Sequence, residues 1–198
     1  MKRIVVAGGI GAGKSAVTGY LVGLGWPVID ADEIAHDVLR PGSHALLALR
    51  DAFGDAVLAP DGTLNRAFVA HIVFHDRSAL ARLNAITHGP IGQEIMRRLD
   101  EATGPAVFVA IPLFRPEHRE LLSLDEVWAV LVHPETAVTR LCELRGFSLD
   151  DATARIANQM TNAERTRIVD RVIWNEGSLS DLFVQVDKAV HEIGLARG

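Results

Sequence analysis

A cluster of glycines near the start of the chain constrains this sequence more than any other feature. The stretch VVAGGIGAGKSAV, residues 5–17, has the spacing Gly-x-x-x-x-Gly-Lys-Ser between positions 8 and 15. Glycine weakens both helices and strands. Such a cluster therefore indicates that the backbone must adopt a conformation other residues disfavour, as in a tight turn. A short apolar run precedes the cluster and a helical pattern follows it. The spacing therefore predicts a phosphate-binding loop at the start of a helix, in preference to an ordinary glycine turn.

The loop pattern also predicts which residues hold a nucleotide. In such loops backbone N–H groups wrap the phosphates, the lysine reaches the β- and γ-phosphates, and the serine hydroxyl binds Mg²⁺. We therefore expect ATP and Mg²⁺ as cofactors, with Lys14 in catalysis and Ser15 as the metal ligand. The nucleotide-binding residues expected in the loop are Gly8, Gly9, Gly11, Ala12, Gly13, Lys14, Ser15 and Ala16.

Strand and helix patterns alternate along most of the chain. This alternation predicts an α/β fold with a parallel sheet covered by helices on both faces. A purely helical region, about residues 33–101, interrupts the alternation and should stand off the sheet as a subdomain, with a break at Gly89-Pro90. A second helical excursion covers about residues 140–168. Strands are expected at residues 2–7, 26–32, 105–111, 126–132 and 171–174.

Composition limits the possible partners and surroundings. Hydrophobic residues make up 48% of the 198 residues and charged ones 23%, which favours a globular protein over disorder. The net charge of −5, without a basic run, argues against a nucleic-acid partner. The single cysteine, Cys142, excludes an internal disulfide. Because no segment approaches the length of a membrane span or a signal peptide, we expect a cytoplasmic protein without membrane contact. The oligomeric state is not predicted.

The second expected strand stops at two aspartates, at the end of the strand where ligands bind in open α/β sheets. A phosphoryl-transfer enzyme needs an acid there to orient the acceptor hydroxyl and take its proton. Asp30 also has capping-box spacing to Glu33, so we assign Asp30 mainly to helix capping and Asp32 to the role of base. The third expected strand ends at Ala110 without an acid, so the duty of a metal-linked carboxylate would pass to this pair.

The second helical excursion is rich in arginine. These guanidinium groups could close over the phosphates and neutralise charge in the transition state, or they could simply line a solvated helical face. We take Arg140 as the best candidate for contact with nucleotide. The arginines concerned are Arg140, Arg145, Arg155, Arg165 and Arg167, whereas His71, His75 and His88 show no metal-ligand spacing.

Motifs spread over about residues 3–190 resemble the dephospho-coenzyme A kinase family: GGIGAGKS, PVIDADEIAHDV, DGTLNR, ARIANQ and DRVIWNEGS. The resemblance implies ATP-dependent phosphorylation of the ribose 3′-hydroxyl of dephospho-coenzyme A, a small-molecule acceptor. It implies that Asp32 is the base at the substrate, and that Arg66 and His88 contact the acceptor. It also places Arg140, Arg155 and Gln159 in a lid, the first two as nucleotide-binding residues.

The same resemblance implies three parts. These are a P-loop kinase core over residues 1–32, 102–139 and 169–198, a helical acceptor-binding subdomain over 33–101, and a helical lid over 140–168.

The chain departs from the family pattern around the expected acceptor and lid regions. Gly89, Arg115, Leu144 and Trp174 stand where the family usually has other residues. These departures leave two alternatives open. One is a related kinase that phosphorylates another nucleoside-like or small-molecule hydroxyl, and the other is a nucleotide-binding protein without turnover. The intact Lys14, Ser15 and Asp32 count against the second alternative.

Overall fold

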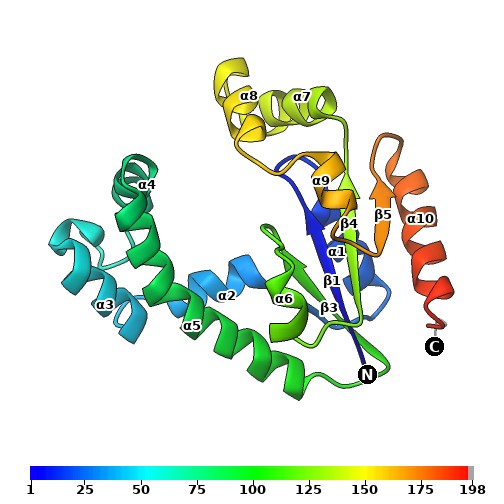
Figure 1. The fold of residues 1–198 in the computed structure, drawn as a ribbon, viewed down its shortest axis with the longest axis horizontal. Coiled ribbons are helices and arrows are strands. Elements are labelled where there is room, and N and C mark those ends of the chain that lie inside the picture. Colours follow the sequence, from blue (N-terminus) through cyan, green and yellow to red (C-terminus); the bar gives the residue numbers. More distant parts are fainter. Residues whose placement is uncertain (196–198) are drawn as a thin grey trace. The chain divides into compact units, whose positions relative to one another are not determined.

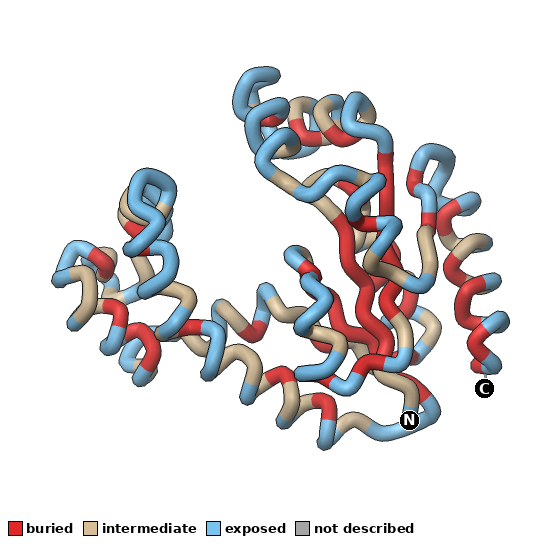
Figure 2. The backbone as a smooth tube through the Cα atoms, viewed as in Figure 1, coloured by how far each residue is buried: buried red, intermediate tan, exposed pale blue. Residues whose placement is uncertain are grey.

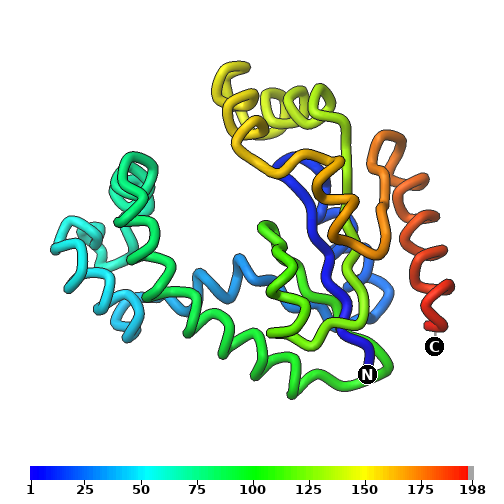
Figure 3. The backbone as a smooth tube through the Cα atoms, viewed as in Figure 1, coloured from blue at the N-terminus to red at the C-terminus, as the bar shows by residue number. Residues whose placement is uncertain are grey.

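The computed structural model describes residues 1–195. The chain divides into two compact units, one made of residues 1–30 together with 101 onward and the other of residues 31–100. Figure 3 shows the chain leaving the first unit after strand β2 (Val28–Asp30) and returning at the end of helix α5 (Arg77–Glu101). No helix within residues 1–195 is both long and apolar enough to cross a bilayer.

The first unit is built on a parallel sheet of five strands in the order β2-β3-β1-β4-β5 (Figure 1). All four strand pairings are parallel, which confirms the predicted α/β class. Strand β1 is central and almost wholly buried, because its run of valine and isoleucine is covered on both sides. Besides β2, the strands are β1 (Lys2–Gly8), β3 (Ala106–Ile111), β4 (Glu126–Leu131) and β5 (Arg171–Trp174).

Two helices share the main core with the sheet. Residues of α1 (Lys14–Gly23) and α10 (Leu179–Glu192) belong to the same buried apolar cluster as Ile4, Phe108 and Trp128. The buried strands are the red segments at the centre of this unit in Figure 2. The remaining helices of this unit are α6 (Glu117–Leu121), α7 (Pro134–Arg145), α8 (Leu149–Ala157) and α9 (Asn162–Thr166).

The second unit is helical and has a small core of its own, formed around Leu46, Leu49, Val57 and Val69. Side chains at the N-terminal ends of two of its helices accept hydrogen bonds from backbone N–H groups, which would otherwise lack partners. The elements are α2 (Ala31–Val38), α3 (His44–Phe53), the 3-10 helix η1 (Asp55–Val57), α4 (Arg66–His75) and α5.

The predicted helix break at Gly89-Pro90 is wrong, because α5 runs unbroken for 25 residues with Pro90 inside it. Proline removes one backbone hydrogen bond and crowds the preceding turn, at a cost of about 3 kcal/mol. Burial on either side of the proline offsets this cost: Thr87 is buried and donates its hydroxyl to the Leu83 carbonyl, and Ile95 is buried one turn further on. Packing of the helix therefore outweighs the local preference.

Candidate active site

The glycine cluster forms a loop between the end of β1 at Gly8 and the start of α1 at Lys14. Gly11 and Gly13 have φ angles of 75° and 90°, a left-handed region that other residues rarely enter. Lys14 is half-buried and Ser15 is exposed, and both lie in the first turn of α1. The N–H groups of a first helical turn have no partners within the helix and point toward an anion placed at that end.

Asn175 holds the centre of this loop. Its Nδ2 donates to the Ala12 carbonyl at 2.8 Å, and the residue is only 5% exposed. A Cβ atom at Gly13 would lie 2.1 Å from the same Nδ2, so glycine is required here by space as well as by φ. Arg140 completes the link, because its guanidinium donates to the Asn175 carbonyl at 2.8 Å and to the Gly11 carbonyl at 3.5 Å.

The segment after β5 that carries Asn175 is itself anchored to two helices. Glu176 accepts hydrogen bonds from the His133 backbone N–H and from the Thr136 hydroxyl at the start of α7. The backbone of Trp174 exchanges two hydrogen bonds with the Gln185 side chain on α10, at 3.0 and 2.7 Å. Asn175, which holds the loop, is therefore fixed through its two neighbours in sequence to helices α7 and α10.

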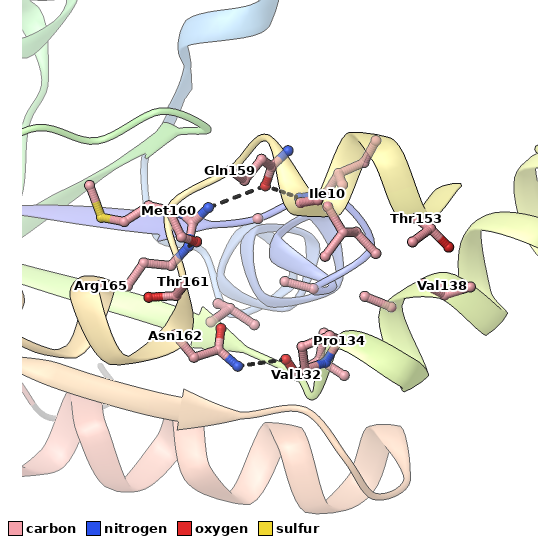
Figure 4. A pocket seen from close by; sticks show the side chains of 16 residues that line it. Ile10, Val132, Pro134, Val138, Thr153, Gln159, Met160, Thr161, Asn162 and Arg165 are labelled. Atoms are coloured by element: carbon pink, nitrogen blue, oxygen red, sulfur yellow. Dashed lines mark hydrogen bonds between the residues drawn. The ribbon is translucent and has the colours of Figure 1, made fainter. Parts of the chain in front are cut away.

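A second contact reaches the strand end of the loop. The Ile10 backbone N–H donates to Gln159 Oε1 at 3.1 Å, and Arg165 Nη2 donates to the same oxygen at 3.2 Å (Figure 4). A Cβ atom at Gly9 would lie 2.9 Å from Gln159 Oε1 and 3.3 Å from Arg165 Nη2. Gly9 is thus a position at which these two side chains lie close to the loop.

A cavity of about 360 Å³ opens between the loop and helices α7, α8 and α9 (Figure 4). Its walls near the loop are apolar, because Ala12, Val132, Ala137 and Ile156 pack together there. Polar groups, Gln159 and Arg165 among them, also line it. The lining residues are Gly9, Ile10, Ala12, Val130, Val132, Pro134, Ala137, Val138, Thr153, Ile156, Ala157, Gln159, Met160, Thr161, Asn162 and Arg165.

The expected arginine contacts differ from one another in the structure. Arg140 touches the loop, as described, whereas Arg155 is exposed and its guanidinium lies 4.6 Å from the ring centre of Phe147. Arg155 does not line the cavity, and Arg165, from the same arginine-rich stretch, does. Asn175 was not singled out from the sequence. The feature that could have pointed to it is its position directly after strand β5. The carboxyl end of β5 lies at the same edge of the parallel sheet as the end of β1, where the glycine loop begins.

Of the remaining expected residues, Asp30 is the last residue of the first unit before the chain enters the second, and the others belong to the second unit. Asp30 is the last residue of β2, and Asp32 follows in the first turn of α2, within residues 31–100. Arg66 is the first residue of α4 and His88 lies within α5, and both are exposed. Within residues 1–195, no group of three or more His, Cys, Asp or Glu side chains could hold a metal on its own.

The second unit contains a charged cavity of about 650 Å³ at helices α2, α3 and α5. Arg98 joins α5 to α2 there, since it donates to Glu94 at 2.9 Å and to Asp37 at 2.9 Å. Hydrogen bonds from Arg97, and then from Arg98, lower the pKa of Glu94 to about 2. Neither Arg66 nor His88 is among the lining residues, which are Asp37, Val38, Arg40, Ser43, His44, Ala45, Pro90, Gln93, Glu94, Arg97 and Arg98.

Comparison with known proteins gives one consistent result at the sequence level. The family model described as "Dephospho-CoA kinase" matches residues 3–181. A dephospho-CoA kinase of Corynebacterium glutamicum is 41% identical over 196 residues, covering 98% of each chain. One from Streptomyces avermitilis is 43% identical over 183 residues, covering 92% of this chain and 89% of its own.

Solved structures agree in fold. The Thermus thermophilus protein TT1252 has a TM-score of 0.82 at 29% identity, with 97% of each chain covered. Dephospho-CoA kinase from Campylobacter jejuni has a TM-score of 0.70 at 29% identity, with 98% of each chain covered. A shikimate kinase from Bacteroides thetaiotaomicron shares the fold at a TM-score of 0.54 and 16% identity, covering 98% of this chain and 99% of its own.

Proposed function

This chain belongs to the dephospho-CoA kinase family, and on that premise we propose how its residues divide the work of phosphoryl transfer. The reaction moves the γ-phosphate of ATP to the ribose 3′-hydroxyl of dephospho-CoA. Such a transfer depends on positioning and charge stabilisation more than on covalent chemistry of the protein. The observation that carries the proposal is the glycine loop at the end of β1, whose shape is held by Asn175, Arg140 and Gln159.

The loop binds the phosphates of ATP in this proposal. Backbone N–H groups of the loop and of the first turn of α1 that have no protein partner cradle them, and the Lys14 ammonium neutralises charge on the β- and γ-phosphates. Arg140 is tied to two loop-linked carbonyls, and we assign it to holding the loop and to countering the charge of the nucleotide. Arg155 contributes from the surface of α8, where its charge stands over Phe147.

The donors present fit Mg²⁺. This ion usually takes one or two protein ligands together with substrate phosphates and water, and it does not need a cage of side chains. The exposed Ser15 hydroxyl at the start of α1 is the protein ligand we assign, and no acid ends β3. When bound, Mg²⁺ neutralises charge on the phosphates. Asp30 at the end of β2 and Asp32 in the first turn of α2 are the next carboxylates along the chain after Ser15.

Asp32 acts as the general base in this proposal. It would accept the proton of the ribose 3′-hydroxyl while the oxygen attacks phosphorus, and it would also orient the acceptor. Asp32 is two residues beyond the end of β2 and exposed enough to receive a substrate. Asp30, at the position directly before α2, serves mainly to begin that helix.

Residues 31–100 bind the acceptor in this proposal, and the helical segment of about residues 140–168 covers the nucleotide. Arg66 and His88 are exposed cationic or polar groups suited to the phosphates of dephospho-CoA. The cavity of the second unit supports an anionic ligand there, because Arg40, Arg97 and Arg98 outnumber the two carboxylates that line it.

The test is direct. Purified protein is incubated with Mg-ATP and dephospho-CoA, and the product is identified by mass spectrometry with fragmentation that locates the new phosphate. We expect coenzyme A carrying the phosphate on the ribose 3′-oxygen. Phosphate transfer only to a simpler nucleoside or sugar, by protein that binds ATP, would overturn the assignment of the acceptor.

A further inference from the structure

Arg165 is the most deeply buried charge beside the glycine loop. It is 7% exposed, although arginine is rarely buried without a partner. Within residues 1–195, no carboxylate forms an ion pair with it. Nearby Glu164 has its carboxylate occupied by the Thr161 backbone N–H and hydroxyl, both at 2.7 Å. Burial lowers the pKa of Arg165 from its ordinary value, the direction expected for a guanidinium taken out of water.

Two of the three nitrogens of this guanidinium are used to aim it. Nε donates to the Met160 carbonyl at 3.1 Å, and Nη2 donates to Gln159 Oε1 at 3.2 Å. Gln159 Oε1 also accepts the Ile10 N–H, so one oxygen joins the guanidinium to the loop backbone (Figure 4). The third nitrogen, Nη1, has no hydrogen-bond partner among residues 1–195, and the residue lines the cavity beside Gly9.

A charge in such a place needs a counterion. Burying a guanidinium without a counterion is costly, and an anionic ligand in the cavity would supply the opposite charge. The helix end of a phosphate loop cradles the α- and β-phosphates, whereas Arg165 stands at Gly9, toward the strand end. The terminal phosphate is the anion that extends in that direction.

We propose that Arg165 is a catalytic residue that donates to the γ-phosphate of ATP, and that Gln159 is a positioning residue that fixes both Arg165 and the Ile10 N–H. This inference rests on the proposed function and names a further residue for that site. As negative charge spreads over the γ-phosphoryl oxygens in the transition state, the fixed guanidinium stabilises it without reorganisation. Arg165 is one of the five arginines that the sequence offers for contact with the phosphates, and unlike Arg155 it lines the cavity beside the loop.

The experiment compares nucleotides that differ only in the terminal phosphate. Calorimetric affinities for Mg-ADP and for Mg-AMPPNP, a non-hydrolysable analogue of ATP, are measured for wild type, Arg165→Met and Arg165→Lys. We expect Arg165→Met to weaken AMPPNP binding about tenfold or more, the size of a charged hydrogen bond, with ADP affinity unchanged. Arg165→Lys keeps the charge but lacks the planar fork, so its affinity for AMPPNP should lie between those of wild type and Arg165→Met.

The matched control is Arg77→Met, which removes the same charge from an exposed position at the start of α5. It should change neither affinity. If Arg165 only braces the turn between α8 and α9, its loss loosens the loop for both nucleotides, and an equal fall in ADP and AMPPNP affinity overturns the proposal. So does unchanged AMPPNP binding.

A crystal structure of the unmodified protein with Mg-AMPPNP gives a readout that does not depend on whether a variant folds. We expect an Arg165 nitrogen within about 3.2 Å of a γ-phosphate oxygen. A γ-phosphate beyond hydrogen-bond reach of Arg165 overturns the proposal. Failure of the proposed function would appear separately, as absence of coenzyme A formation by wild type, because these binding measurements need no acceptor.

Discussion

Lys14 is the one lysine of the glycine loop and begins helix α1 directly after the left-handed Gly13. We expect Lys14→Met to weaken ATP binding and to lower turnover about a hundredfold or more, because a preorganised positive charge on the β- and γ-phosphates is lost. Lys188→Met on the exposed face of α10 is the control, since it removes the same charge far along the chain. Calorimetry with ATP and a coupled ADP-release assay report the two effects, and unchanged values for both would contradict the role of Lys14.

Asp32 and Asp30 allow a matched comparison of two acids separated by a single residue. We expect Asp32→Asn to lower kcat by about 10² or more with little change in ATP affinity, the size expected for loss of a general base. Asp30→Asn should cost less, because asparagine also serves at the start of a helix. Steady-state kinetics with dephospho-CoA distinguishes the two. A larger loss from Asp30→Asn would mean that the base has been assigned to the wrong residue.

A charged link joins helices α2 and α5. Glu94 accepts two hydrogen bonds from Arg97, at 2.8 and 2.7 Å, and Arg98 bridges Glu94 to Asp37. Because these bonds favour the ionised carboxylate, they hold the pKa of Glu94 at about 2, below its usual 4.5. Its contribution to the free energy of unfolding is therefore present above about pH 4.5 and is lost as the pH falls toward about 2.

Glu94→Gln tests this link between the helices. We expect the substitution to lower the free energy of unfolding by less than about 1 kcal/mol near neutral pH, since the groups are partly exposed and screened. The difference from wild type should shrink between about pH 4.5 and pH 2. Urea denaturation at several pH values measures it, with Glu143→Gln on the exposed face of α7 as the control. A difference that persists undiminished at low pH would mean that ionisation of Glu94 is not the cause.

Local sequence patterns predicted most of the elements, because the signals involved are short-range. The strand β1, the glycine loop and helix α1 are continuous in sequence, and Pro134 at the start of α7 and Ser148 before α8 mark helix starts by their own chemistry. Pro90 misled the prediction, since the packing of α5 is a property of the whole unit and no local pattern reports it.

The arginine-rich stretch shows why the site was less predictable than the fold. Helix α8 ends at Ala157, and a capping box at Thr161 starts α9 as a separate short helix. The four-residue break redirects the chain, so that Arg165 faces the loop and Arg155 lies on the surface. The sequence predicts a helical excursion over about residues 140–168, and its pattern does not show where the chain changes direction between two short helices. Asn175 was missed for a related reason, because its partner Ala12 is 163 residues away.

The two units have separate cores, one centred on the sheet and one on Leu46 and Leu49. If residues 31–100 bind the acceptor, each substrate should protect its own unit against hydrogen exchange. We expect Mg-AMPPNP to slow exchange in residues 8–15 and in α7 to α9, and dephospho-CoA to slow exchange in residues 31–100. Mass spectrometry of peptides from each complex measures this, and the unliganded protein is the reference.

One outcome would contradict the assignment of the second unit. Dephospho-CoA, added without nucleotide, could protect only peptides of the sheet unit and leave residues 31–100 as they are in the unliganded protein. The acceptor would then bind outside the helical unit. Protection confined to α2, α3 and α5 would instead point to the charged cavity as the place where the acceptor is held.

The side chains that shape the glycine loop bear on how a growing chain acquires activity. The loop is complete after 15 residues, but its partners Arg140, Gln159 and Asn175 lie 129 to 163 residues later. At ribosomal rates they follow on the order of ten seconds after the loop itself. A nascent or truncated chain that stops before Asn175 therefore contains the whole nucleotide motif but lacks the contacts that fix it. We therefore expect nucleotide binding only after Asn175 has been synthesised.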